Sequence, residues 1–186
     1  MQKKVKEKSY KQMLWVSMIS MTMMFAGLTS AYVVSRNRED WVQFDLPQAF
    51  YISTLLIILS SITFFLANKV LGQDKRSQTT IFLLLTLLLG LGFVYFQFHG
   101  FSQLIDTGLF FTGKESNVAS SFLYVITLAH VIHVLAGILV LIWIIFRHFL
   151  NKYSSNDKLG LELGAIFWHF VDALWIYLFL FFYFIR

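Results

Sequence analysis

The stretch Phe167-Trp168-His169-Phe170-Val171-Asp172-Ala173-Leu174-Trp175 lies near the middle of a run, Gly160 to Arg186, that is otherwise almost entirely apolar. At a rise of about 1.5 Å per residue, a helix of that length crosses the roughly 30 Å hydrocarbon core of a bilayer. Ionisable side chains at that depth are costly, so they usually have a partner or a function. His169 and Asp172 are three residues apart, which places them on one face of a helix. They are the first candidates for a functional site.

The composition of the whole chain is that of an integral membrane protein. Of its 186 residues, 58% are hydrophobic and 13% are charged, whereas soluble domains have about 25% charged residues. The mean hydropathy is +0.68. The chain has no cysteine, which excludes disulfides, iron–sulfur clusters and thiolate-bound zinc or copper. The net charge of +5 comes from basic residues at the segment ends, a pattern that does not indicate a nucleic-acid partner.

Five apolar segments are each long enough to cross a bilayer as a helix. Backbone groups in lipid must be satisfied internally, so we expect an all-α bundle of five transmembrane helices. A β-barrel is not expected, because barrel strands are about ten residues long and alternate in polarity. Residues 1–12 form a basic tail, and short connectors unite residues 13–186 in a single transmembrane domain. The predicted helices cover about residues 13–35, 48–71, 79–101, 119–146 and 160–185.

Lysine and arginine residues predict how the chain is oriented. Eleven of them lie in the tail and in the second–third and fourth–fifth connectors, against four on the other side. Positive residues accumulate on the cytoplasmic side, so we expect the N-terminus inside and the C-terminus outside. Small residues mark expected helix contacts. They are Gly90 with Gly92, Ala136 with Gly137, and Gly160 with Gly164.

The fourth segment carries two further ionisable residues, His130 and His133, again on one helical face. Because the fourth and fifth segments run in opposite directions, His133 and Asp172 are expected at about the same depth. This placement is compatible with a His133–Asp172 contact between the helices and with a His169–Asp172 contact within the fifth. Glu162 lies in the first turns of the fifth helix, where a carboxylate complements the positive end of the helix dipole.

Three interpretations of these polar residues are open from the residues alone. The side chains could satisfy one another and fix the register of two helices. Three histidines and an aspartate could instead bind zinc, iron or a bis-histidine haem, which would make the chain a membrane-embedded metalloenzyme. They could also relay protons. A small transporter with a polar midplane site is disfavoured because the sequence has no inverted repeat.

Several motifs, taken in order, resemble subunit III of the haem–copper oxidases. The most specific is Trp168-His169-Phe170-Val171-Asp172-x-x-Trp175, which resembles the C-terminal signature of that family. The family has His-x-x-His-Val in the preceding helix, as at 130–134, and a Gly-x-Glu ahead of the signature itself, as at 160–162. Weaker matches are Phe25-Ala26-Gly27, Leu46-Pro47 followed by Ser60-Ser61, and Gly92-x-x-Tyr95-x-Gln97. Together they cover the chain from about Met13, in the shorter five-helix bacterial form.

The resemblance implies an accessory subunit of a respiratory terminal oxidase, with no redox centre of its own and with haem and copper in partner subunits. It implies contact with catalytic subunit I and other oxidase subunits, bound phospholipid, support of proton uptake, and a place in the bacterial cytoplasmic (inner) membrane. A relative associated with nitric oxide reductase is the alternative. The resemblance assigns no catalytic residue and no metal ligand. It implies a structural, lipid or intersubunit polar cluster of His130, His133, Glu162, Trp168, His169, Asp172 and Trp175.

The chain departs from the family at two acidic positions. Met21 follows Ser20 where the family often has a glutamate, and Gly100 stands where the family tends to have another, three residues after Gln97. Proton uptake through acids at these two positions is therefore not expected. The electron donor, cytochrome c or quinol, would be bound by other subunits.

Overall fold

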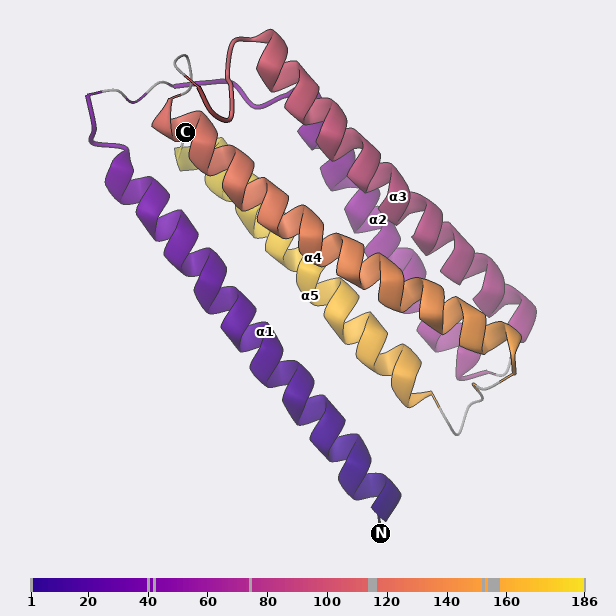
Figure 1. Cartoon of the computed structure of the whole chain (residues 1–186). Helices are drawn as coiled ribbons and strands as arrows, with labels where there is room; N and C mark the ends of the chain where they lie inside the picture. Colours follow the sequence, from indigo (N-terminus) through magenta and orange to yellow (C-terminus); the bar gives the residue numbers. More distant parts are fainter. Residues whose placement is uncertain are drawn as a thin grey trace.

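The computed structural model describes residues 2–39, 41, 43–73, 75–113, 117–151, 153 and 158–185, and it describes side chains from residue 5 onward. Within these residues the regular secondary structure is helical throughout, which confirms the predicted all-α architecture. Each helix is long and apolar enough to cross a membrane, as expected for a multi-pass membrane protein. The five helices are α1 (Gln2–Ser35), α2 (Gln48–Leu71), α3 (Arg76–Asp106), α4 (Val118–Phe149) and α5 (Leu159–Ile185) (Figure 1).

Most helices extend beyond the apolar segments that predicted them. Only α2 coincides with its segment, and the largest difference is in α1, which begins at Gln2 instead of near Met13. The basic tail is therefore a continuation of the first helix. Lysine, glutamine and glutamate all favour helix, so the fall in hydropathy marks the edge of the membrane and not the end of the helix.

α5 is the central helix of the bundle. It contacts α1, α2 and α4, while α2 and α3 form the most extensive helix pair. In Figure 1, α1 lies along one side, α4 and α5 occupy the centre, and α2 with α3 forms the opposite side. The N- and C-termini lie at opposite ends of the bundle, as an odd number of crossings requires.

Side-chain contacts define how α5 is aligned with its neighbours. α2 is antiparallel to α5, and the rings of Tyr51 and Phe179 meet with centroids 5.1 Å apart. α1 is parallel to α5, and the hydroxyl groups of Thr29 and Tyr177 are 3.2 Å apart. Both contacts lie toward the end of the bundle where α1 and α5 finish and α2 begins, and they align the three helices there.

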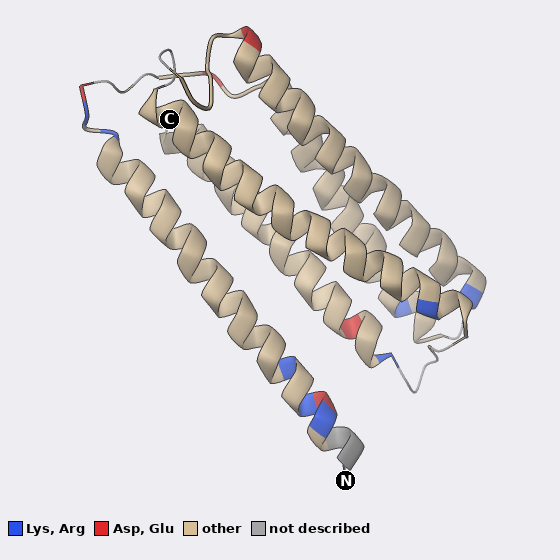
Figure 2. Ribbon diagram, in the orientation of Figure 1, with Lys and Arg blue, Asp and Glu red and all other residues tan. Residues whose placement is uncertain are grey.

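Charged residues gather at the ends of the bundle. Figure 2 shows lysine and arginine concentrated at the end where α1 and α5 begin and α4 finishes. This distribution leaves apolar helix between two charged ends, which is the pattern of a membrane-crossing bundle. Some residues used for the orientation lie outside the described residues, namely Lys114, Lys152, Arg186 and the side chains of Lys3 and Lys4.

Aromatic residues fill the centre of the bundle. Trp175 is fully buried, and its ring lies 5.8 Å from Phe50, 5.3 Å from Phe93 and 5.1 Å from His130, measured between centroids. Helices in lipid gain little from hydrophobic transfer, so close van der Waals packing of such rings is what holds them together.

Candidate functional site

Two hydrogen bonds of the same kind join α5 to α2. The indole N–H of Trp168 donates to Oγ of Ser60 at 3.1 Å, and that of Trp175 donates to Oγ1 of Thr54 at 2.9 Å. Each hydroxyl donates in turn to a carbonyl of its own helix, at 2.9 Å from Ser60 and 2.7 Å from Thr54. All four donors are satisfied, which matters because no water is present in the bilayer core to replace a missing partner.

Glycines in two other helices make room for Trp168. A Cβ added at Gly90 of α3 would lie 2.8 Å from the Trp168 ring, and one at Gly137 of α4 would lie 3.2 Å from it. Gly164 of α5 lies directly against Ile144 of α4. The predicted helix contacts are thus found at Gly90, Gly137 and Gly164, whereas Ala136 is exposed and Gly160 lies against Tyr153 in the connector before α5. One indole ring thus sets the approach of α2, α3 and α4 to α5.

His169 contacts the helix pair from its outer side. Its Nδ1 lies 2.7 Å from Oγ of Ser61, the residue after the partner of Trp168. The His169 ring is partly exposed and lines a hollow of about 300 Å³ with Ser61, Ile62 and Phe65. His169 therefore joins the same α2–α5 contact as the two tryptophans, but from the surface.

Asp172 does not make either of the two contacts considered for it from the sequence. Among the described residues, no hydrogen bond joins Asp172 to His133 or to His169. His133 uses its Nδ1 within its own helix, 2.7 Å from the carbonyl oxygen of Ala129. His169 turns to Ser61 instead. Asp172 is 3% exposed, and its Oδ2 has no hydrogen-bond partner in the part of the chain that the structure describes.

Among the described residues, the hydrogen bonds of Trp168, His169 and Trp175 therefore run to α2 and not to α4, and neither contact that the sequence left open for Asp172 is formed. The sequence predicted the shared depth but not the rotation of each helix about its axis. That rotation is set by Trp168 and Trp175, whose large rings must fit into the bundle and whose N–H groups must reach hydroxyl groups.

His130 is buried completely in an aromatic surrounding. Its ring lies 5.9 Å from Phe93, 6.4 Å from Phe25 and 5.1 Å from Trp175, between ring centroids. Neither ring nitrogen has a hydrogen-bond partner among the described residues. His130 thus packs as a flat ring between α1, α3 and α5.

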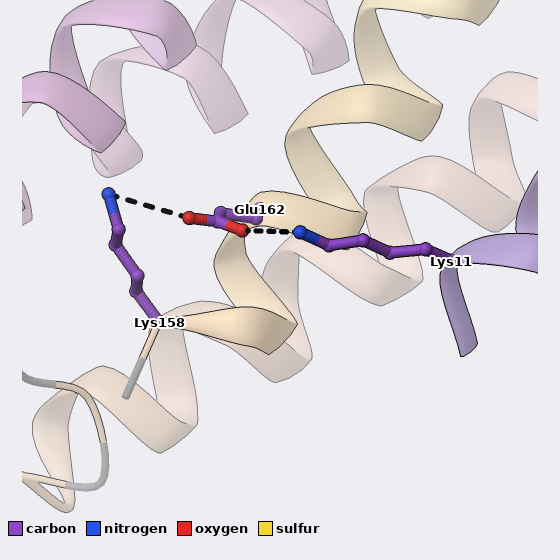
Figure 3. Close-up of polar contacts among 3 residues, drawn as sticks. All are labelled: Lys11, Lys158 and Glu162. Carbon is purple, nitrogen blue, oxygen red and sulfur yellow. Dashed lines mark hydrogen bonds and ion pairs between the residues drawn. The ribbon is translucent and has the colours of Figure 1, made fainter. Parts of the chain in front are cut away.

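Glu162 lies at the charged end of the bundle. Its carboxylate is 3.2 Å from Nζ of Lys11 in α1 and 3.4 Å from Nζ of Lys158, just before α5 (Figure 3). The carboxylate is also in the first turn of α5, as predicted, where the helix dipole favours it. Glu162 therefore ties the helical tail to the start of α5, away from the other candidate residues.

The described residues contain no group of three histidine, cysteine, aspartate or glutamate side chains placed to hold a metal ion. The three candidate histidines have different surroundings: His130 lies among aromatic rings, His133 bonds within its own helix, and His169 faces Ser61. The metalloenzyme interpretation consequently has no support from the geometry.

Sequence reasoning named Trp168, Trp175 and His169 but missed their partners in α2, which are Thr54 and the pair Ser60-Ser61. A signal was present, because hydroxyl residues recur near the middle of an otherwise apolar segment. Hydroxyl groups in membrane helices often bond to their own backbone, so the sequence alone does not reveal which ones also accept from another helix.

Comparison with known proteins gives the same family that the sequence motifs indicated. The sequence matches the family model of cytochrome c oxidase subunit III over residues 4–186. It is 33% identical over 139 residues to cytochrome c oxidase subunit 3 of Drosophila melanogaster, covering 75% of this chain and 51% of that protein. Identity to cytochrome c oxidase subunit 3 of Thermostichus vulcanus is 30% over 174 residues, covering 89% of this chain and 82% of that protein.

The sequence is about equally similar to a relative whose name refers to ubiquinol and not to cytochrome c. Cytochrome bo(3) ubiquinol oxidase subunit 3 of Pseudomonas putida is 30% identical over 175 residues, covering 89% of this chain and 80% of that protein. The match thus spans about half the length of the Drosophila proteins and about four fifths of the two bacterial ones.

Proposed function

The chain belongs to the cytochrome c oxidase subunit III family, and we propose that it is an accessory subunit of a respiratory haem–copper oxidase. In this proposal the chain holds no redox centre, and haem and copper belong to partner subunits. It stabilises catalytic subunit I, binds phospholipid and supports proton uptake. It lies in the bacterial cytoplasmic membrane with the lysine-rich end, where α1 and α5 begin, facing the cytoplasm.

The use of the α5 signature is the observation that carries the accessory role. Trp168 and Trp175 bond to α2, and Trp168 also packs against glycines of α3 and α4. The two tryptophans of the signature therefore serve helix packing inside this chain, and they do not meet at a common reaction site. Such an arrangement suits a rigid scaffold beside a catalytic subunit.

An apolar hollow between α1 and α5 supports the proposal of lipid binding. Its volume is about 390 Å³, and its lining is almost wholly apolar, which suits an acyl chain better than a polar ligand. The lining residues are Thr22, Phe25, Ala26, Phe170, Ala173, Leu174 and Tyr177.

Support of proton uptake would be indirect, exerted through subunit I. Met21 and Gly100 stand where the family often has glutamates. Gly100 lies directly against the ring of Phe50, so a larger side chain does not fit there without displacing that ring. The packing is thus built around the absence of a side chain at this position.

Gentle purification from native membranes tests this function. We expect the chain to co-purify with a haem-bearing large subunit, and to be colourless and free of metal once it is separated. Stoichiometric metal on the separated chain would contradict the proposal and favour a metalloenzyme. Purification without any haem-bearing partner would contradict it as well.

A further inference from the structure

We propose that the hollow formed by Ser61, Ile62, Phe65 and His169 receives a transmembrane helix of another oxidase subunit, which forms a hydrogen bond with His169. This inference rests on the proposed function and names the face through which the chain meets its partner. The hollow lies on the outer side of α2 and α5, and it is distinct from the apolar hollow between α1 and α5.

The first argument is an unmet hydrogen bond. The Nδ1 of His169 is engaged with Ser61, but Nε2 has no partner among the described residues, and the ring is partly exposed. Whichever nitrogen carries the proton, Nε2 is left with one unused donor or acceptor. A polar group facing hydrocarbon without a partner is costly, so this surface is poorly suited to lipid.

The second argument is depth. α5 begins at Leu159, so His169 lies about 15 Å along the helix, near the middle of a hydrocarbon core of roughly 30 Å. Lipid headgroups lie at the edge of that core and acyl chains offer no hydrogen bond. A polar side chain on a neighbouring membrane helix can supply one at this depth.

The third argument is the shape of the surroundings. Ile58, Ile62 and Phe65 of α2 are 38%, 51% and 60% exposed. Their spacing of four and then three residues places them in one stripe along the helix. The stripe and the hollow beside it form a ridge and a groove, the surface relief into which a second helix packs.

His133 marks a competing face on α4. Its ring is also partly exposed and packs against Phe25 of α1, but its Nδ1 is engaged within its own helix at Ala129, and no hydrogen bond to a second helix is found among the described residues. His169 instead belongs to a contact between two helices and sits in a hollow. The two faces can be compared directly by experiment.

Because the chain has no cysteine, a single introduced cysteine is its only thiol. The test compares Ile62→Cys with a matched control, Ile132→Cys. Ile62 is 51% exposed in α2 and Ile132 is 57% exposed in α4, and each lies beside one of the two histidines. Both variants are assembled into the oxidase complex and treated with a nitroxide spin label, and the signal from a complex with the cysteine-free chain is subtracted.

We expect the label at position 62 to be incorporated less, or to collide with dissolved oxygen several-fold less often, than the label at 132. Equal and high oxygen collision at both positions would mean that lipid covers both, and it would overturn the inference. Frequent collision with a water-soluble nickel chelate at 62 would reveal a water-filled hollow and would also overturn it. Protection at 132 alone would assign the α4 face. In all these cases the complex has assembled, so the proposed function stands.

A second comparison separates the partner's hydrogen bond from the internal one. Ser61→Ala removes the contact with Nδ1, and also the interaction of Ser61 with Asp172, but leaves His169 available to a partner, whereas His169→Leu removes both contacts of the histidine. We expect His169→Leu to increase dissociation of the chain from the detergent-solubilised complex several-fold more than Ser61→Ala. Equal effects of the two substitutions would show that only the internal bond matters.

Discussion

The indole N–H of Trp168 donates to the hydroxyl of Ser60 at 3.1 Å, and this bond joins the centre of α5 to the centre of α2. Seven residues further along α5, Trp175 repeats the arrangement with Thr54. Both indoles donate to hydroxyl groups that already donate to their own helix. The tryptophans of the α5 signature therefore bind to hydroxyl residues of α2.

Replacing Trp168 by phenylalanine should weaken the fold moderately. Trp168→Phe keeps an aromatic ring but removes the N–H donor and leaves space beside Gly90 and Gly137. We expect a loss of about 1–3 kcal/mol, combining one hydrogen bond and a small cavity. Thermal unfolding in detergent measures it. Trp143→Phe is the control, because Trp143 is 59% exposed, and an equal effect there would refute the special role of Trp168.

Two glycines of α3 should respond oppositely to the same change. Gly100→Ala places a methyl group against the ring of Phe50, and we expect a destabilisation of about 1–3 kcal/mol. Gly92→Ala meets only ordinary contact with Leu56 at 3.4 Å, so the gain in helix propensity should leave stability unchanged or raised by up to about 1 kcal/mol. Melting temperatures of the two variants decide the matter, and a stabilised Gly100→Ala would show that Phe50 moves aside freely.

The ion pairs of Glu162 should contribute little and depend on salt. The Glu162 side chain is 29% exposed, and its partners Lys11 and Lys158 are more exposed, so water and ions screen both contacts. We expect Glu162→Gln to lower stability by less than about 1 kcal/mol at low ionic strength. The difference from the parent chain should vanish in concentrated salt. A difference that persists in salt would indicate a role beyond the two ion pairs.

Asp172 and His133 should affect assembly more than electron transfer. Because Asp172 and His133 lie in this chain and the proposed redox centres lie in its partners, Asp172→Ala and His133→Ala should weaken retention of the chain or its lipid. Oxygen consumption by complexes that keep the chain should continue. The measurement is the amount of chain and phospholipid per haem, alongside the rate of oxygen reduction. Complete loss of oxygen reduction in a fully assembled complex would contradict this expectation.

The sequence by itself determined the number of membrane crossings, their approximate limits and the family. Hydropathy gives the crossings and their limits because a residue's transfer into lipid depends on its own chemistry and not on its neighbours in space, whereas the family follows from the motifs. Helix ends were less accessible: the tail before Met13 is helical although it is too polar for the membrane core. The importance of Trp168, His169 and Trp175 was also visible, since polar groups are rare in such a segment.

Only the tertiary structure decided which helix Trp168, His169 and Trp175 contact. From depth alone Asp172 could meet His133 or His169, yet His133 bonds within its own helix and His169 bonds to Ser61. The choice depends on the rotation of each helix about its axis. That rotation follows from fitting the indole rings against Gly90 and Gly137 while their N–H groups reach hydroxyl groups, a condition that involves four helices at once.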